Sequence, residues 1–567
     1  SRSGNGCFHY CTACRAGTSL HVGGAVVSSA MAPSDFFILL ATPTLDPRTA
    51  LRRTFDVVDG HFSVGLVMDQ QRTKRVLDFH AWAGVVSALF IYIVSLSGVF
   101  ALFETELLQW EEPQVQFQTP AQPTALMPLV REYADTLQAT GRLASLDVYL
   151  PNATRPYYEV IAYWAPEGEQ RSKKQTRRWH AQTGQILEPH EDGLTHWLVN
   201  FHRSLMLPRT AGRFIVGLSG VLLLVSILSG ILLHRKMLKE MFTWRLHRSV
   251  RLKWQDSHKI LGLWSLPFQL MIAFTGAWLG MIALLLPLNA TLTGKWGIEE
   301  IYGALFPSGP SAAGISAPML PLDEVMIATR PHLDNAPQSI SIKNWGDQDA
   351  TYIFLYEPHG TLDGTLRREV NAVTGEIYDV PHIDRSGPIY QVLRSMTTLH
   401  YAWFGGGWVK ILYTVLGSFL CIIAITGVLI WLEKREHGGK GNAPKAVYTM
   451  LGRMTIGTSM GMLIASFAVF YVDRLSTPLP GEKLTTIGIA YLAIWGLGIV
   501  FAGVSRNPYR STKHLLYVTG AVALGIPLLS GLTGSSLLLP VACVDAICAI
   551  VGLLLIGVGV KLKPHRA

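Results

Sequence analysis

The chain has 567 residues, of which 49% are hydrophobic and only 15% carry a charge. Soluble chains carry about 25% charged residues, so this composition excludes a simple soluble enzyme, a disordered chain and a disulfide-rich secreted module. The net charge of +9 raises the question of a nucleic-acid partner. Membrane proteins gather Lys and Arg in their cytoplasmic loops, however, so the positions of these residues decide the matter.

Residues 1–70 show little periodicity and scattered Gly, Ser and Pro, which indicates a disordered or non-native N-terminal extension with Met68 as a candidate natural start. Eight predominantly apolar stretches follow, each near the roughly 20 residues that cross a bilayer. They are residues 81–103, 214–233, 260–288, 411–432, 454–472, 484–504, 515–534 and 537–560. We therefore expect a mainly α membrane protein with eight transmembrane helices.

Basic residues recur after every even-numbered stretch. The loop at 235–257 is the most basic, and residues 434–445, 506–513 and 561–566 are basic as well. Because Lys and Arg mark cytoplasmic loops, both termini are expected in the cytoplasm. Membrane lipid is then the expected surrounding of the chain, and no nucleic acid is needed to explain its charge.

Two long connections, about 104–210 and 288–407, then lie on the other side of the membrane. Each reads as a helix followed by extended segments, and each carries a Thr-Gly turn, at Thr183 and Thr374. We expect two extracytoplasmic α+β domains.

The first and third apolar stretches are related in sequence. The pattern Asp-x-His-x3-Gly begins at Asp78 and again at Asp256, and a hydroxyl–glycine pair follows in each, at Ser97 and Thr275. These matches need no gap. Internal similarity of this kind indicates a repeated structural unit.

The second and fourth stretches repeat likewise, because His202 aligns with His400 and Ser229 with Thr426, each hydroxyl again preceding a glycine. Residues 72–234 and 258–437 are therefore two parallel copies of span, external domain and span. They predict a duplicated four-helix core with a pseudo-two-fold axis along the membrane normal. Residues 450–560 form a four-span extension without the histidine motif.

Four histidines thus occupy equivalent positions at the ends of the core spans. His80 and His258 fall at the cytoplasmic ends, and His202 and His400 at the outer ends. Neutral imidazole is a strong axial ligand of haem iron, so symmetry predicts one haem between His80 and His258 and a second between His202 and His400. A continuous helix from His202 would separate the two levels by more than about 40 Å.

Other residues bear on this hypothesis. Gly84 and Gly262, one turn beyond two of the histidines, are where a porphyrin face could approach a helix, and Arg203 could pair with haem propionates. His234 is a reserve ligand for the inner haem. His196 is six residues before His202 and does not share its helical face, so we expect it to be a surface residue.

Competing interpretations remain open. A single histidine at a membrane interface is usually a polar residue that reaches water. A zinc or copper pathway would need three or four converging ligands. Each end of the core offers only two equivalent histidines and one spare, which is His234 at the inner end and His196 at the outer end. Asp545 is an intramembrane charge for which the sequence suggests no partner.

These motifs, with the F-H-R-S-L segment at Phe201, the L-H-Y segment at Leu399 and the paired T-G-x-I loops, resemble the PepSY-associated transmembrane (iron-regulated membrane protein) family. The resemblance covers roughly 72–437. It implies a bacterial inner-membrane protein with two periplasmic PepSY domains. Some members are ferric-siderophore reductases that use two bis-histidine b haems. Carried over, His80 and His258 would serve the inner haem, and His202 and His400 the outer one.

The expected function is therefore a ferric-chelate (siderophore) reductase with two haem b groups. No G-x-G-x-x-G follows a strand, so the electron donor is expected to be a quinol, a reduced flavin or a partner protein. The alternative is a non-enzymatic PepSY membrane regulator that binds a peptide or protease. A metal or siderophore transporter component is a third possibility, although the core lacks paired intramembrane charges.

Overall fold

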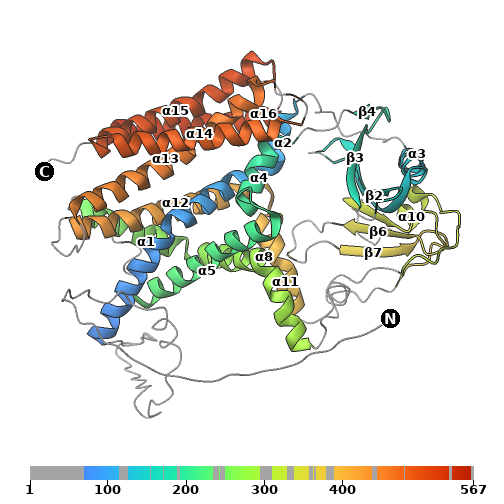
Figure 1. Cartoon of the computed structure of the whole chain (residues 1–567), viewed down its shortest axis with the longest axis horizontal. Helices are drawn as coiled ribbons and strands as arrows, with labels where there is room; N and C mark the ends of the chain where they lie inside the picture. The colour runs from blue at the N-terminus through green and yellow to red at the C-terminus, as the bar shows by residue number, and fades with distance from the viewer. Residues whose placement is uncertain are drawn as a thin grey trace, which may run out of the picture. The chain divides into compact units, whose positions relative to one another are not determined.

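The computed structural model describes residues 69–113, 125–152, 155–169, 172–187, 192–233, 242, 250–293, 310–328, 337–356, 362, 366–378, 388–436, 444–477, 479, 481–535 and 539–562. These residues are mostly helical and include one antiparallel sheet (Figure 1). The expectations for residues 1–68 and for His234 fall outside the described residues.

Among the described residues, seven helices are long and apolar enough to cross a membrane. They are α1 (Gln70–Ala101), α5 (Arg209–Leu233), α12 (Gly406–Glu436), α13 (Lys445–Leu475), α14 (Lys483–Val504), α15 (Pro508–Leu532) and α16 (Leu539–Lys561). The pair α7 (Val250–Trp264) and α8 (Leu266–Thr293) makes an eighth span only if the two are counted together. The protein is therefore a multi-pass membrane protein.

Helices α7 and α8 meet at 70° on either side of Ser265. Pro267 explains the bend, because proline lacks the N–H of the helix ladder and clashes with the carbonyl four residues earlier. Gln269 compensates for the break by donating from Nε2 to the Gly262 carbonyl at 3.0 Å and to Ser265 Oγ at 2.7 Å. The apolar stretch at 260–288 thus spans two helices, and Pro267 is the residue in it that signals the break.

Two short helices precede the spans α5 and α12. Helix α4 (Leu194–Ser204) ends at Leu205 and Met206, which have φ of 53° and 58°, and α11 (Pro388–Tyr401) ends at Ala402 with φ of 58°. Positive φ in a residue with a side chain ends a helix. The continuous helix expected from His202 through the second span is therefore wrong, and the 40 Å length estimated from it does not apply.

Helix α1 packs against α5 and α12, and α8 packs against α5. These four helices share the buried side chains Ile91, Leu223, Ile227, Ala273 and Leu420. Helices α5 and α8 come closest, because a Cβ on Gly217 would lie 2.9 Å from Gly280 Cα, and a Cβ on Gly220 would lie 2.7 Å from the Ala273 carbonyl oxygen. Small residues permit such close approach between membrane helices.

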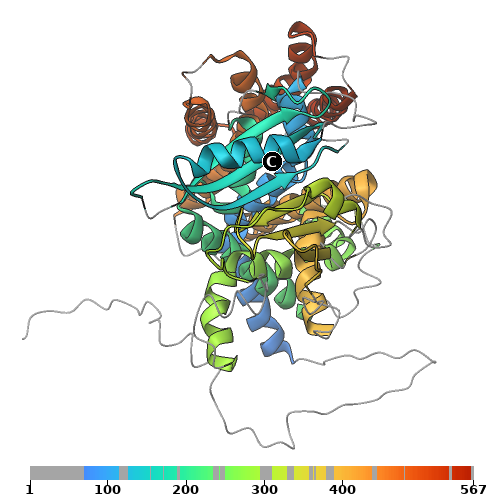
Figure 2. The same cartoon turned by 90° about the vertical axis from the view of Figure 1, so that its right-hand side faces the viewer.

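The strands of both long connections form one sheet in the order β4-β3-β2-β1-β5-β6-β7. They are β1 (Gly141–Tyr149), β2 (Tyr157–Pro166), β3 (Lys173–His180), β4 (Ile186–Leu187), β5 (Ser339–Lys343), β6 (Thr351–Tyr356) and β7 (Leu366–Asn371). Antiparallel pairing of β1 with β5 joins the two connections, which lie side by side in Figure 2. The sequence predicts strands in each connection but not their union.

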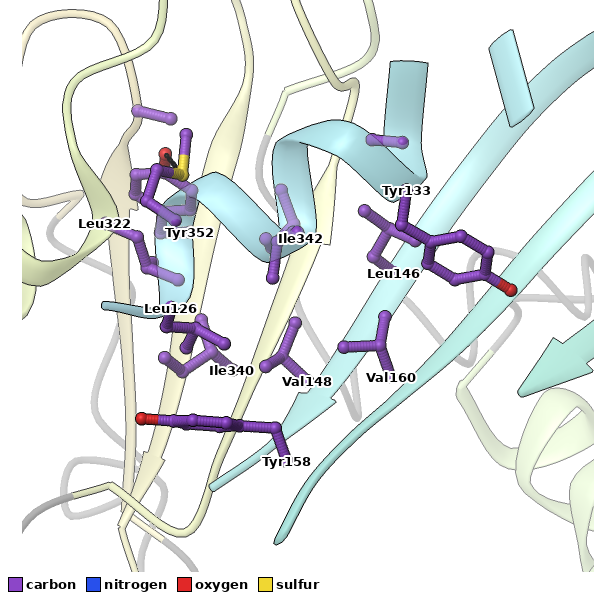
Figure 3. Close-up of a cluster of buried hydrophobic side chains, with 14 of the residues drawn as sticks. Leu126, Tyr133, Leu146, Val148, Tyr158, Val160, Leu322, Ile340, Ile342 and Tyr352 are labelled. Atoms are coloured by element: carbon purple, nitrogen blue, oxygen red, sulfur yellow. Dashed lines mark hydrogen bonds between the residues drawn. The ribbon is translucent and has the colours of Figure 1, made fainter. Parts of the chain in front are cut away.

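One face of this sheet is covered by α3 (Leu126–Gln138) and α10 (Leu322–Ala328) (Figure 3). Alternate residues of β1, β2, β5 and β6 point into the core, as the two-residue period of a strand requires. The core includes Leu126, Tyr133, Leu146, Val148, Tyr158, Val160, Leu322, Ile340, Ile342 and Tyr352. Side chains of both connections therefore share one hydrophobic core.

The four C-terminal helices, α13 to α16, pack beside the helical core. Helix α13 makes the contact with α1 and α12, and it also packs against α14 and α15. The short helix α2 (Glu104–Glu111) lies against α16. Asp545, for which the sequence suggests no partner, accepts hydrogen bonds from Trp110 Nε1 at 3.1 Å and Ser530 Oγ at 2.9 Å. The intramembrane carboxyl group thus joins α16 to α2 and α15.

We expect Gly217→Ala to destabilise the protein, because the added methyl group would force α5 and α8 apart. Overpacking of this kind typically costs about 1–3 kcal/mol. Gly496→Ala is the matched control, since a Cβ there would meet no atom within 4 Å and alanine favours a helix over glycine. Thermal unfolding of the detergent-solubilised variants measures the difference, and equal midpoints would contradict the close packing.

Candidate functional site

Two pairs of histidine rings lie close together between the two parts of the core. The first pair is His80 on α1 and His258 on α7, whose ring centroids are 6.4 Å apart with planes at 78°. The second pair is His202 on α4 and His400 on α11, whose centroids are 6.2 Å apart with planes at 19°. The structure thus brings together the four histidines in the two combinations expected from sequence.

Backbone carbonyls fix the proton position on one ring of each pair. His202 Nδ1 lies 3.0 Å from the Val94 carbonyl oxygen, and His258 Nδ1 lies 3.0 Å from that of Ile423. A carbonyl oxygen can only accept, so Nδ1 of a neutral ring must carry the proton here. Nε2 is then the nitrogen with a lone pair, as a metal ligand requires.

Hydroxyl groups hold the other ring of each pair. Ser229 Oγ lies 2.9 Å from His80 Nδ1 and also donates to the Val225 carbonyl at 2.9 Å. Thr275 Oγ1 lies 2.9 Å from His400 Nδ1 and donates to its own helix at 2.8 Å. Because each hydroxyl hydrogen is used within the helix, the oxygen accepts the Nδ1 proton. All four rings are therefore assigned the same tautomer.

A hydroxyl also lies near Nδ1 of the other two rings, Ser97 beside His202 at 3.4 Å and Thr426 beside His258 at 3.2 Å. Each of the four rings lies against the glycine that follows its hydroxyl residue. A Cβ added there would come within 3.4 Å of the histidine Cε1 atom. The contacts are Gly230 with His80, Gly427 with His258, Gly98 with His202 and Gly276 with His400. A larger residue would push the ring out of place.

The recurrence of these four hydroxyl–glycine pairs in every core span is the sequence signal of this contact, although the pairs were expected only to mark the repeat. The glycines expected beside a porphyrin were Gly84 and Gly262. A Cβ at either of those positions would meet no atom within 4 Å. The glycines that matter to the rings are thus on the helix opposite each histidine.

A cavity of about 290 Å³ adjoins the second pair. Its wall is mainly apolar and comes from α1, α4, α5, α8, α11, α12 and the start of the short helix α2. Three basic side chains (Arg203, Arg213 and Lys410) and one acidic side chain (Glu104) line it. Arg203 donates to Tyr401 Oη at 3.3 Å, and Lys410 forms an ion pair of 2.7 Å with Glu106. Basic side chains beside an apolar cavity suit a ligand with an apolar body and acidic groups.

Burial keeps the second pair neutral. It lowers the pKa of His202 to about 4 and that of His400 to about 3, because a buried imidazolium loses its hydration. Neutral imidazole is the form that binds metals. These rings therefore have the charge state of a ligand across the physiological pH range.

The ring separations fit a haem iron held between two imidazoles. Two metal–imidazole bonds of about 2 Å each and the two ring radii together span about 6 Å, close to the observed centroid distances. Among the described residues, no group of three or more His, Cys, Asp or Glu side chains could hold a metal ion. Two ligands and a mainly apolar cavity suit a planar macrocycle, which supplies the remaining equatorial ligands itself.

Of two further histidines singled out in the sequence, the structure places one. His196 is on α4 and pairs with Asp192 at 3.1 Å, with its side chain 40% exposed, as a surface residue would be. The reserve ligand His234 is outside the part of the chain that the structure describes. The residue of the second copy that aligns with His234 is Trp431, which is buried and packs edge-on against Trp82.

The low pKa values predict that acid destabilises the protein. Between about pH 6.5 and 4 the unfolded chain binds protons at these two histidines whereas the folded chain does not, so stability falls as the pH falls. We expect the doubly substituted His202→Gln, His400→Gln variant to lose less stability between pH 7 and 4 than the parent protein. Tryptophan-detected thermal unfolding at a series of pH values measures this, and parallel losses would contradict the assignment.

The comparisons with known proteins agree with this architecture. The profile of the PepSY-associated TM region matches residues 77–434, more than half of the chain. A relative from Pseudomonas aeruginosa, named "Uncharacterized protein PA4219", is 27% identical over an aligned length of 351 residues, and the match covers 58% of this chain and 84% of the relative. The match ends before α13, so the four C-terminal helices extend beyond the family region. The chain belongs to the PepSY-associated transmembrane family.

Proposed function

We propose that this protein is a transmembrane oxidoreductase that holds two haem b groups and passes electrons from the cytoplasmic side to ferric chelates, such as siderophores, on the periplasmic side. The observation that carries this proposal is the pair of facing imidazoles at each of two sites, with centroids 6.4 Å and 6.2 Å apart. Hydrogen bonds at Nδ1 leave the ligating role to Nε2 in all four rings.

The proposal includes a duplicated core in a bacterial inner membrane. The Lys and Arg residues that follow the even-numbered spans support a cytoplasmic position for both termini. The first pair, His80 and His258, would then be the inner site, and the second pair, His202 and His400, the outer site. The shared sheet would lie in the periplasm.

Haem, when bound, supplies a one-electron carrier at each site. The residues of the chain would hold it in place: neutral imidazoles as axial ligands, glycines that leave room for those imidazoles, and Arg203, Arg213 and Lys410 as partners for acidic groups. The substrate iron gains one electron and changes from Fe(III) to Fe(II). Fe(II) is bound less tightly by hard oxygen donors, so the chelate releases it.

A second candidate function is a membrane regulator that binds a peptide or protease. Strands β4 and β7 are the two ends of the shared sheet. Residues 376–378 already bond to part of the β7 edge, and an edge strand can pair with an added peptide strand where its main chain is not already bonded. The two functions differ in a simple observation, because a regulator of this kind would be colourless when purified.

We expect purified protein from haem-replete cells to contain about two low-spin haems per chain, with α bands that appear on reduction by dithionite. His400→Ala and His258→Ala should each lose about half of this haem. His196→Ala should retain all of it, since that side chain is exposed and pairs with Asp192. A wild-type protein without a Soret band would overturn the proposed function.

The two sites should also fail differently in oriented membrane vesicles. His258→Ala should block electron entry from the cytoplasmic side, while an external reductant still reduces the outer haem. His400→Ala should still accept electrons at the inner haem but should reduce external ferric chelate poorly. Haem absorbance after donor is added on one side at a time measures this, and identical behaviour of the two inserted variants would count against sequential transfer.

A further inference from the structure

Helix α4 carries His202, yet it is not a continuation of the span that follows it. Left-handed residues Leu205 and Met206 separate it from α5. Its orientation must therefore be set by contacts along its own length and at its other end. That end, Leu194, is eight residues before His202, or about 12 Å along the helix axis.

Two carboxylates from distant parts of the chain bind the first backbone amides of α4. Leu194 N donates to Glu111 Oε1 at 3.0 Å and to Asp473 Oδ1 at 3.2 Å, and Thr195 N donates to Glu111 Oε2 at 3.1 Å. Negative charge is favourable at the N-terminus of a helix, where amides lack partners within the helix. We call Glu111 and Asp473 the α4 cap.

The α4 cap is buried and paired with a lysine. The side chain of Glu111 is 0% exposed and that of Asp473 is 2% exposed. Lys483 of α14 lies 2.9 Å from Asp473 Oδ1 and 3.5 Å from Glu111 Oε1. Buried carboxylates are retained only when they are paired and hydrogen bonded, so this geometry is costly to disturb.

The residue before α4 shows how closely the cap is fitted. A Cβ on Gly193 would collide with Glu111 Oε1 and would lie 2.8 Å from Asp473 Oδ1 and 2.9 Å from Lys483 Cε. The glycine therefore leaves the space that the two carboxylates and the lysine occupy. Alanine at this position would displace the carboxylates without changing any charge.

One face of α4 is also packed against α14. The Trp197 ring lies 4.2 Å from that of Tyr491 and stacks on Phe201 at 4.9 Å, and a Cβ on Gly488 would lie 2.8 Å from Trp197 Nε1. His202, next to Phe201, is held from the other direction by the Val94 carbonyl of α1. Helix α4 is thus fixed between the core and the C-terminal helices.

We propose that Glu111 and Asp473 are positioning residues for His202, and that the C-terminal helices thereby set the geometry of the second histidine pair. The assignment to a haem site rests on the proposed function, whereas the effect of the cap on α4 does not. The C-terminal helices then complete the outer site without supplying a ligand.

The test compares full-length variants by hydrogen–deuterium exchange of the α4 amides and by the low-spin haem signals in electron paramagnetic resonance. Gly193→Ala and Glu111→Ala should each speed exchange in α4 by about fivefold or more, as expected for the loss of a helix cap. The outer haem signal should shift or disappear, while the inner signal stays unchanged. If Glu111→Ala does not fold, Gly193→Ala and the milder Asp473→Asn carry the comparison.

Glu112→Gln is the matched control. The neighbouring Glu112 pairs with Arg178 of the sheet at 3.3 Å, so exchange in α4 should remain at the wild-type rate. Wild-type exchange in Gly193→Ala would overturn the positioning role. A wild-type protein without haem would overturn the proposed function, but the exchange rates would still decide whether the cap holds α4.

Discussion

Each of the four histidines is held by a hydrogen bond from its Nδ1 to the adjacent helix, and the arrangement of the core depends on this contact. The bond joins α1 to α5 through His80 and Ser229, and α8 to α11 through Thr275 and His400. A polar ring between apolar helices is stable only with such a partner. The same bond fixes the tautomer, so the structural requirement and the requirement of a metal ligand are met together.

The Nδ1 hydrogen bonds of the histidines and the contacts between paired histidine rings join different parts of the core. Each Nδ1 bond stays within one half of the core, either residues 70–233 or residues 250–436, whereas each facing pair takes one ring from each half. The separation between facing rings therefore depends on how the halves pack. That packing is set by close contacts such as Gly217 against Gly280, where no side chain separates the helices.

The sequence predicted much of the site, because repetition reveals equivalent positions without any knowledge of distance. Equivalence alone identified His80 with His258 and His202 with His400 as pairs. It did not show that α4 is a separate helix, although Pro208, just before α5, was a local signal of the break. The positive φ at Leu205 has no such signal in the sequence. The role of Asp473 was equally hidden, because a cap supplied from 279 residues away leaves no local pattern.

The shared sheet limits how the two halves of the core can move. Five residue pairs, from Ser145 opposite Lys343 to Tyr149 opposite Ser339, join a strand of the first half to a strand of the second. A carrier that alternates access by rocking one half against the other would have to shear this main-chain pairing and its common hydrophobic core in every cycle. The sheet thus holds the two halves of the core at a fixed spacing. A fixed spacing between the two histidine pairs suits electron transfer better than it suits transport by alternating access.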